Sequence, residues 1–210
     1  MVVFEAGSPR GIVLFAAGAG GDPRRYSTLL EGLARGRLTV LAPTSPRLDP
    51  RNVTGDQLRE RAAGLRSALA EHADERLPVT IVGHSIGGAA ALSLAGAVPW
   101  GRDAQPIPVP TEGRVTRVVL LAPSLGWFGA PGALSKVRVP IEVFAGAEDV
   151  ITPPETTEVL HSAPGPVQID VDEHVGHFDC MTELPPGETP ARGAGHGAFL
   201  EALAARVAGS

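Results

Sequence analysis

Short runs rich in apolar and β-branched residues alternate along this chain with stretches of helical periodicity. The runs cover residues 12–16, 38–42, 77–82, 115–121, 139–145 and 167–171, and a shorter one lies around residues 2–5. Runs of this length with few polar positions are typical of strands that are buried on both faces of a parallel sheet. We therefore expect these segments to form the strands of a central sheet.

Helix-starting signals lie between the expected strands. Asp22 and Pro23 have the residue types of an N-cap and a first helical position. Residues 54–57 (Thr-Gly-Asp-Gln) have the pattern of a capping box, and residues 152–155 (Thr-Pro-Pro-Glu) are expected to form a second one at the start of a short helix. Behind the first box, one helical face carries Leu58, Ala62, Leu65 and Leu69.

The alternation of strands and helices predicts the fold class. With a helix expected after residue 87 and a closing helix over residues 198–207, the pattern indicates an α/β protein with a doubly wound, mostly parallel sheet and helices on both faces. The chain has 210 residues, 43% of them hydrophobic, and shows neither an internal repeat nor a long linker. We expect a single domain over residues 1–210.

Charge and cysteine content restrict the function classes. The chain has 18 Lys and Arg residues against 23 Asp and Glu, a net charge of -5, and no basic block, so nucleic acid is not an expected partner. Cys180 is the only cysteine, which excludes an intrachain disulfide. No cluster of His, Cys and Asp has the spacing of metal ligands, and the sequence implies neither a metal nor another cofactor.

The sequence shows no signal for a membrane. Its N-terminal segment has no basic stretch followed by a long apolar one, and no apolar run approaches the roughly 20 residues that span a bilayer. We therefore expect a cytoplasmic protein without a membrane partner. A secreted form whose leader has been removed is the alternative.

Residues 83–87 (Gly-His-Ser-Ile-Gly) connect an expected strand to an expected helix. A serine between glycines at a sharp strand-to-helix turn is a nucleophile elbow, in which the hydroxyl stands at the carboxyl end of the strand near the positive end of the helix dipole. Glycines relieve the crowding of the two backbones at such a turn. Ser85 is therefore the candidate nucleophile, and a plain strand-to-helix turn is the alternative.

A nucleophilic serine needs a base that takes its proton and an acid that orients the base. In proteins with this elbow the chain order is serine, acid, histidine. Asp149 follows an expected strand and is the candidate acid, with Glu148 as its competitor. His177 follows the last expected strand and is the candidate base. Its rivals are His174 in the same loop and His196, which adjoins the closing helix and is interpreted as a helix-start residue.

The negative charge that develops on the substrate during such a reaction needs backbone N–H donors. Ile86, the residue after the candidate nucleophile, is expected to supply one of them. The glycine-rich segment 16–21 follows the first long strand and is expected to supply the other. This segment has neither the G-x-G-x-x-G spacing nor the lysine of a phosphate-binding loop, which argues against nucleotide binding.

In these features the chain resembles the α/β-hydrolase superfamily over essentially its whole length. The matching parts are the loop at Gly18, the elbow 83–87, the loop at Asp149 and the segment 176–178 (Gly-His-Phe). The resemblance implies Ser85 as nucleophile, Asp149 as acid and His177 as base. The compact size and residues 176–179 resemble those of small dienelactone-hydrolase-like and chlorophyllase-like esterases.

The chain also departs from the family pattern. Residues 17–18 (Ala-Gly) stand where members often carry His-Gly, which removes a side chain but not the backbone donor, so Ala19 is the expected second oxyanion donor. The N-terminal antiparallel strands are shortened. The segment 122–138 is too short for a cap domain, and its Trp127 and Phe128 are expected either to line the substrate pocket or to seal the sheet edge.

Together these features predict a cofactor-free serine hydrolase that cleaves a small-molecule carboxylic ester, lactone or thioester through an acyl-enzyme intermediate. A lyase or acyltransferase with the same catalytic residues is an alternative, because one fold supports several chemistries. A non-catalytic binding protein that kept the fold is a further alternative, against which the intact order of serine, acid and histidine counts. The sequence leaves the oligomeric state open.

Overall fold

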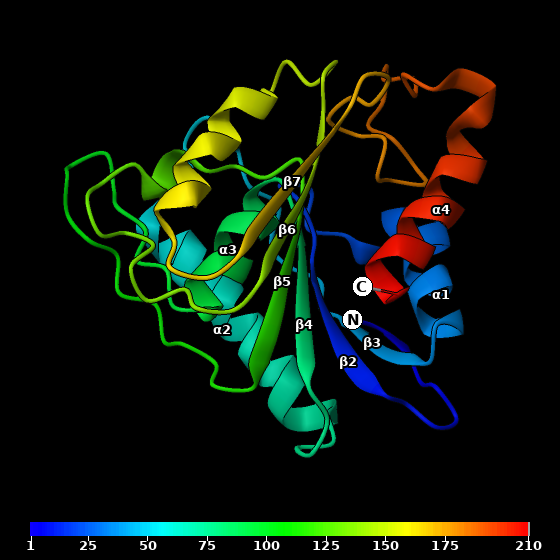
Figure 1. Ribbon diagram of the computed structural model, residues 1–210, viewed down its shortest axis with the longest axis horizontal. Helices are drawn as coiled ribbons and strands as arrows, with labels where there is room; N and C mark the ends of the chain where they lie inside the picture. Colours follow the sequence, from blue (N-terminus) through cyan, green and yellow to red (C-terminus); the bar gives the residue numbers. More distant parts are fainter. Residues whose placement is uncertain (210) are drawn as a thin grey trace.

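The computed structural model describes residues 1–209, with a seven-stranded sheet at its centre (Figure 1). The strands are β1 (Val2–Phe4), β2 (Gly11–Ala16), β3 (Leu38–Ala42), β4 (Val79–His84), β5 (Val115–Leu121), β6 (Ile141–Gly146) and β7 (Val167–Asp172). Their order across the sheet is β1-β3-β2-β4-β5-β6-β7, with β1 antiparallel to β3 and the remaining pairs parallel. The predicted mostly parallel sheet is thus confirmed.

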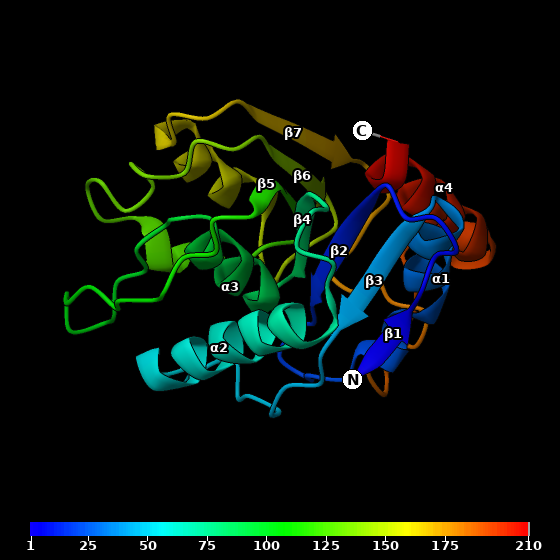
Figure 2. The ribbon, with the colours of Figure 1, turned by 90° about the horizontal axis from the view of Figure 1, so that it is seen from below.

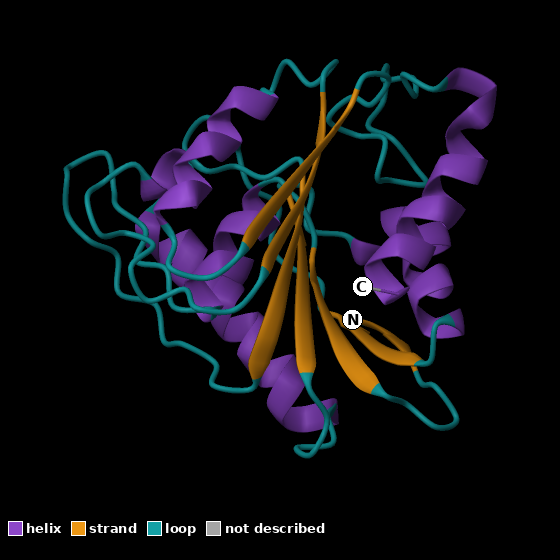
Figure 3. Ribbon diagram, viewed as in Figure 1, coloured by secondary structure: helices purple, strands orange, loops and turns teal. Residues whose placement is uncertain are grey.

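Helices cover both faces of this sheet. The α-helices are α1 (Ser27–Arg35), α2 (Gly55–His72), α3 (Ile86–Leu94) and α4 (His196–Gly209), and shorter 3₁₀ helices lie at Pro23–Tyr26, Gly126–Phe128, Pro154–Ser162 and Gly193–Gly195. Helices α2 and α3 lie on one face, and α1 and α4 lie on the other (Figure 2 and Figure 3). The predicted doubly wound arrangement is therefore confirmed.

Side chains of the central strands alternate between two hydrophobic cores. On β2, Ile12 and Leu14 belong to the core that includes α2 and α3, whereas Val13 and Phe15 belong to the core that includes α1 and α4. Successive side chains of a strand point to opposite faces, so a strand in a sheet covered on both sides is apolar at every position. This explains why the run 12–16 shows no polar alternation.

The capping box expected at residues 54–57 is present at the start of α2. The Thr54 hydroxyl accepts a hydrogen bond from the Gln57 N–H, and the Gln57 side chain accepts one from the Thr54 N–H. Both bonds satisfy N–H groups near the helix start that have no partner within the helix.

The prediction of a second capping box at residues 152–155 is wrong. The helix there is a 3₁₀ helix whose cap residue is Pro153, and within residues 1–209 its start has no side-chain cap. The Thr152 hydroxyl instead lies 2.7 Å from Asp149 Oδ2. The helix begins one residue later than the pattern predicted, so Thr152 does not occupy the cap position, and its hydroxyl donates to a charged carboxylate.

The sheet brings distant parts of the chain to one edge. Strands β4, β6 and β7 run parallel to one another, so the segments that follow them emerge at the same edge. These segments carry Ser85, Asp149 and His177. Within residues 1–209 no helix has the length and apolar character needed to cross a membrane.

Candidate active site

Ser85 separates β4 from α3 in an uncommon backbone conformation. Its φ of 52° and ψ of -124° lie in a region that residues other than glycine rarely adopt. Neighbouring backbones approach so closely that glycine is required: a Cβ on Gly83 would lie 2.6 Å from the Gly87 carbonyl oxygen, and one on Gly87 would lie 2.1 Å from the Ala16 carbonyl oxygen. The turn holds the Ser85 side chain at the sheet edge at a strain on the order of 1–3 kcal/mol.

A continuous chain of hydrogen bonds joins Ser85, His177 and Asp149. His177 Nε2 lies 3.0 Å from Ser85 Oγ, and His177 Nδ1 lies 2.8 Å from Asp149 Oδ2. All three side chains are buried. Because a carboxylate only accepts hydrogen bonds, the Nδ1–H of His177 donates to Asp149, and Nε2 is left to accept the Ser85 hydroxyl proton.

The Asp149 carboxylate is also held by its own loop. Its Oδ1 accepts the N–H groups of Ile151 and Thr152, both at 2.8 Å, and its Oδ2 accepts the Thr152 hydroxyl at 2.7 Å. Burial by itself would raise the pKa of Asp149, but the hydrogen bonds from His177 and Thr152 outweigh it and hold this pKa below its usual value. Asp149 is therefore charged at neutral pH.

Thr152 belongs to this site, although the sequence analysis did not identify it as such. Its Oγ1 lies 3.0 Å from His177 Nδ1 as well as 3.1 Å from the Ala122 carbonyl oxygen. The sequence signal that could have identified Thr152 is its position three residues after Asp149. At this spacing the hydroxyl and the N–H of a threonine can both donate to the preceding carboxylate. The hydroxyl thus borders the contact between the candidate base and the candidate acid.

The rival residues lie elsewhere. Glu148 is exposed, and its carboxylate lies 3.7 Å from Nδ1 of the exposed His174. His196 is the first residue of α4, as expected, and its Nε2–H donates to the Asp179 carbonyl oxygen at 2.9 Å. Among the histidines of residues 1–209, His177 is the one whose ring bonds the candidate nucleophile.

The buried Asp179 anchors the loop that carries His177. Its Oδ2 accepts the Gly176 N–H at 2.8 Å, and its Oδ1 accepts the Ala191 N–H at 3.1 Å. These bonds join the end of the β7 loop to the segment before α4. The position of the His177 ring is therefore set by contacts on both sides of it in the sequence.

His84, the residue before Ser85, forms a second buried chain of hydrogen bonds. Its Nε2 lies 2.9 Å from the His177 carbonyl oxygen, and its Nδ1 lies 2.8 Å from the Tyr26 hydroxyl, which accepts the Gly18 N–H at 3.1 Å. A carbonyl accepts only, so Nε2–H donates and Nδ1 accepts from Tyr26. Burial, together with the nearby His177, lowers the pKa of His84 to about 3, so the ring is neutral.

The expected oxyanion donors, Ile86 and Ala19, lie on two segments that touch. Gly87 of α3 packs against the end of β2 so closely that no side chain fits between them. Ile86 is the first residue of α3, and Ala19 lies in the turn after β2. Within residues 1–209 neither N–H has a hydrogen-bond partner in the protein. Both groups are therefore available to a bound oxygen, and their role stays a prediction.

A cavity of about 300 Å³, here called the outer cavity, opens beside His177. It is lined by Glu148, Val150, Ile151, Gly176, His177, Phe178, Asp179, Glu188, Thr189 and Ala191. Val150 and Ile151 are aliphatic and yet 89% and 53% exposed. Exposed apolar side chains next to a cavity are typical of a binding site.

The two aromatic residues of segment 122–138 do not line the outer cavity. Phe128 is 1% exposed and packs in the core between the sheet and α3, so it is a core residue rather than a pocket residue in this structure. Trp127 borders a different cavity, of about 420 Å³, between the start of α2 and the loop around residues 101–107. The sequence could not show which way either ring points.

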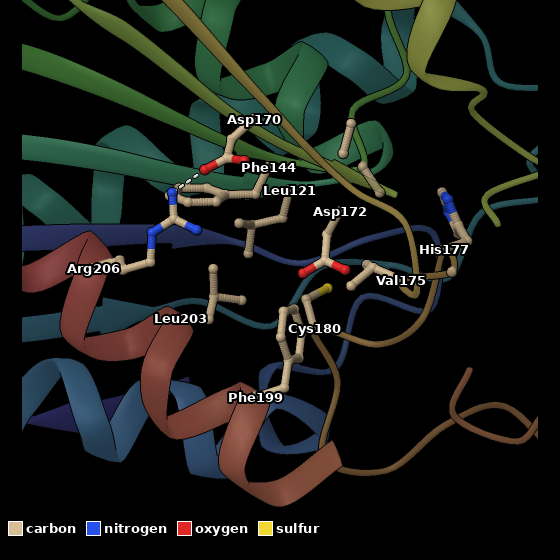
Figure 4. A pocket seen from close by; sticks show the side chains of 13 residues that line it. Leu121, Phe144, Asp170, Asp172, Val175, His177, Cys180, Phe199, Leu203 and Arg206 are labelled. Atoms are coloured by element: carbon tan, nitrogen blue, oxygen red, sulfur yellow. Dashed lines mark hydrogen bonds and ion pairs between the residues drawn. The ribbon is translucent and has the colours of Figure 1, made fainter. Parts of the chain in front are cut away.

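A much smaller inner cavity of about 30 Å³ lies between the sheet and α4 (Figure 4). Leu121, Leu203 and Phe199 surround it, Asp170 and Arg206 form an ion pair at one end, and His177 lies at the other (Figure 4). A water molecule needs roughly 10–15 Å³ of such space, so this cavity holds water at most and not a substrate.

No metal site is evident in the described part of the chain. Within residues 1–209, His, Cys, Asp and Glu side chains are nowhere grouped in threes so that they could bind a metal ion. The ionisable groups of the site bind one another and backbone N–H groups instead.

Several solved hydrolases have the same fold. A dienelactone hydrolase from Anabaena variabilis matches with a TM-score of 0.69 and 22% identity, over 97% of this chain and 88% of that one. A monoacylglycerol lipase from Paleococcus ferrophilus matches with a TM-score of 0.66 and 15% identity, over 99% of this chain and 97% of that one. An esterase from Thermogutta terrifontis with bound propionate matches with a TM-score of 0.62 and 19% identity, over 98% of this chain and 86% of that one. The same esterase has also been solved phosphorylated by paraoxon.

A family model matches nearly the whole sequence. It is described as the alpha/beta hydrolase family and covers residues 13–208, from β2 to the end of α4. No curated protein matches the sequence. The matched range includes the elbow, the Asp149 loop and the His177 loop. The chain therefore belongs to the alpha/beta hydrolase family.

Proposed function

We propose that this protein is a serine hydrolase that cleaves a carboxylic ester, lactone or thioester through an acyl-enzyme intermediate. The observation that carries the proposal is the chain of hydrogen bonds from Ser85 through His177 to Asp149, at 3.0 and 2.8 Å. A hydroxyl, a base and an acid that orients the base are the groups that covalent acyl transfer requires. The esterases and lipases among the proteins of like fold support the same conclusion.

In the proposed reaction, Ser85 Oγ attacks the carbonyl carbon of the substrate while its proton moves to His177 Nε2. The imidazolium then gives this proton to the leaving oxygen or sulfur, and the acyl group stays on Ser85. Water, activated by the same ring, releases the acid in a second step. Asp149 keeps its charge throughout and holds Nδ1–H, so that Nε2 stays free to accept.

The negative charge of the tetrahedral intermediate would be bound by backbone N–H groups. Ile86 and Ala19 have N–H groups without a partner in the described residues, at the two segments that meet at Gly87. A donor of this kind commonly contributes roughly 100- to 1000-fold to turnover. The proposal therefore assigns the oxyanion site to the start of α3 and the turn after β2.

The outer cavity is the proposed substrate site. Its Val150 and Ile151 would contact an apolar part of the substrate, and both residues belong to the loop that holds Asp149. Its volume of about 300 Å³ is at the lower end of the range for small-molecule pockets, roughly 300–1000 Å³. We therefore expect a compact ester with a short acyl chain rather than a long lipid.

Covalent labelling tests the proposal directly. The protein is incubated with a fluorophosphonate, and the adduct is located by mass spectrometry. We expect one adduct, at Ser85, and hydrolysis of 4-nitrophenyl acetate or butyrate, of a small lactone or of a thioester. Both the labelling and the hydrolysis should vanish in Ser85→Ala.

Ser93→Ala is the matched control, because Ser93 lies on α3, the helix that follows Ser85, and its hydroxyl donates to the Ala89 carbonyl oxygen. It should label and hydrolyse as the unchanged protein does. Labelling that persists in Ser85→Ala would contradict the assignment of the nucleophile. Absence of both labelling and hydrolysis in the unchanged protein would contradict the proposed function.

A further inference from the structure

A buried arginine lies on the apolar face of α2. Arg61 is 3% exposed and lies between Leu58 and Leu65 on the side of the helix that packs against the sheet. Arginine is rarely buried unless it is paired with a carboxylate. Within residues 1–209 no acidic side chain forms an ion pair with Arg61. Burial lowers its pKa to about 10, so the guanidinium is charged at neutral pH.

Backbone carbonyls take the place of the missing carboxylate. Arg61 Nη1 donates to the carbonyl oxygens of Ala17 and Gly18 at 2.5 and 3.0 Å, and Nη2 donates to that of Pro46 at 3.2 Å. Among the described residues, the Arg61 Nε–H finds no hydrogen-bond acceptor. The cation is thus committed mainly to the turn after β2, the segment that carries Ala19.

These contacts fix the direction of the Ala19 N–H. In a trans peptide the C=O and the N–H of one unit point in opposite directions. The unit that joins Ala17 to Gly18 is held at both ends, by Arg61 at its oxygen and by the Tyr26 hydroxyl at its N–H. The next unit is held at the Gly18 oxygen by Arg61 and by the Gly21 N–H, so its Ala19 N–H points away from Arg61 and is free.

The same cation affects the strength of this donor. A hydrogen bond from a charged group to a carbonyl polarises the peptide and makes its N–H a better donor. No carboxylate of residues 1–209 forms an ion pair with Arg61 to neutralise its positive charge. A negative oxygen bound at Ala19 would supply the missing counter-charge, and it exists only during the reaction.

We propose that Arg61 is a positioning residue for the oxyanion site: it holds and polarises the Gly18–Ala19 peptide so that the Ala19 N–H stabilises the tetrahedral intermediate. This inference rests on the proposed hydrolase function. Arg61 acts through the peptide and does not touch the substrate. Its effect should therefore fall on kcat and on the binding of transition-state analogues, not on KM.

The test compares Arg61→Met, which has similar length and no charge, with Arg61→Lys, which keeps the charge. The probes are a 4-nitrophenyl ester, for kcat and KM, and a trifluoromethyl ketone, which forms a tetrahedral oxyanion on serine. In Arg61→Met we expect kcat and ketone affinity to fall together by roughly 10- to 100-fold, with KM within about threefold. Arg61→Lys should recover part of both.

Arg10→Met is the matched control, since Arg10 also donates to backbone carbonyls, those of Gly36 and Ala208, away from the site. It should keep the original kcat. If Arg61→Met does not fold, Arg61→Gln serves as the uncharged variant with the same expected loss.

Several outcomes would overturn the inference. The first is an unchanged kcat in Arg61→Met or Arg61→Gln. The second is a rise in the KM of such an uncharged variant at constant kcat. The third is that the Met, Gln and Lys variants all fail to fold, which would make Arg61 purely structural. Inactivity of the unchanged protein toward both probes would instead reject the proposed function, and this inference with it.

Discussion

His84 donates a hydrogen bond from Nε2 to the main-chain carbonyl of His177 at 2.9 Å. His84 directly precedes Ser85, so this bond connects the strand that ends at the candidate nucleophile to the loop that carries the candidate base. On its other side the ring binds Tyr26, and through it the turn that carries Gly18. One neutral, buried imidazole thus joins three segments of the site.

Stability should depend on pH because of His84. Burial, together with His177, lowers its pKa from 6.5 to about 3 in the folded protein, where the ring faces the Tyr26 hydroxyl, the His177 ring and carbonyl, and Asp149. Between pH 6.5 and 3 the unfolded chain binds a proton that the folded protein does not, so the free energy of unfolding should fall as the pH is lowered through this window.

Urea unfolding at a series of pH values measures this dependence. His84→Gln cannot titrate and should show a flatter curve between pH 6.5 and 3, whereas His161→Gln, a change at an exposed residue, should leave the slope as it is. Equal slopes for the unchanged protein and His84→Gln would show that another group controls the acid transition.

Replacement of the candidate base should be far more damaging than replacement of its rivals. His177→Ala should lower kcat by about 10⁴- to 10⁶-fold, because base and nucleophile act as one unit. His174→Ala should stay near the original rate, since the His174 ring is exposed beside Glu148. Steady-state kinetics on a reactive ester decides this, and a collapse in His174→Ala with an active His177→Ala would reverse the assignment.

The acid should be needed for orientation rather than for stability. Asp149→Asn should lower kcat by about 10⁴-fold, because an amide no longer fixes Nδ1–H of His177. Glu148→Gln, at the exposed neighbour, should have little effect. Thermal melts should show both variants folded. A dominant kinetic effect at Glu148 would refute the choice of Asp149.

Removal of the Thr152 hydroxyl should give a smaller and distinct defect. Thr152→Val keeps the shape but takes one donor from the Asp149 carboxylate, so the pKa of Asp149 should rise and kcat should fall by roughly tenfold. The acid limb of the pH–rate profile should move to higher pH, and Thr152→Ser should restore it. An unchanged profile would mean that the hydroxyl has no electrostatic role.

The exposed aliphatic residues of the outer cavity should contribute to substrate binding. Ile151→Ser should raise KM a few-fold while kcat changes little, because each buried methylene contributes about 0.8 kcal/mol. Val171→Ser, at an exposed valine on β7, is the control and should leave KM as it is. A specificity constant that keeps rising with acyl length to long-chain esters would indicate a deeper site than the outer cavity.

Much of this architecture follows from local pattern. The unbroken apolar run in β2 requires a sheet covered on both faces, and that arrangement is present. Parallel strands place their following loops at one edge, so the order of Ser85, Asp149 and His177 was enough to predict that these side chains would meet. Gly83 and Gly87 mark the turn because only glycine fits the close backbone approach.

Tertiary structure decided the partners of polar and aromatic side chains. The pattern at residue 152 indicated a helix cap, but in the fold the Thr152 hydroxyl lies 3.0 Å from His177 Nδ1 and 3.1 Å from the Ala122 carbonyl oxygen. Phe128 could face either the pocket or the core from its sequence, and packing puts it in the core. Arg61 interrupts an apolar helix face, and only the approach of the turn after β2 supplies its acceptors. Sequence periodicity sets which residues share a face, whereas the identity of a side chain's partner depends on segments that are distant in sequence and meet only in the folded chain.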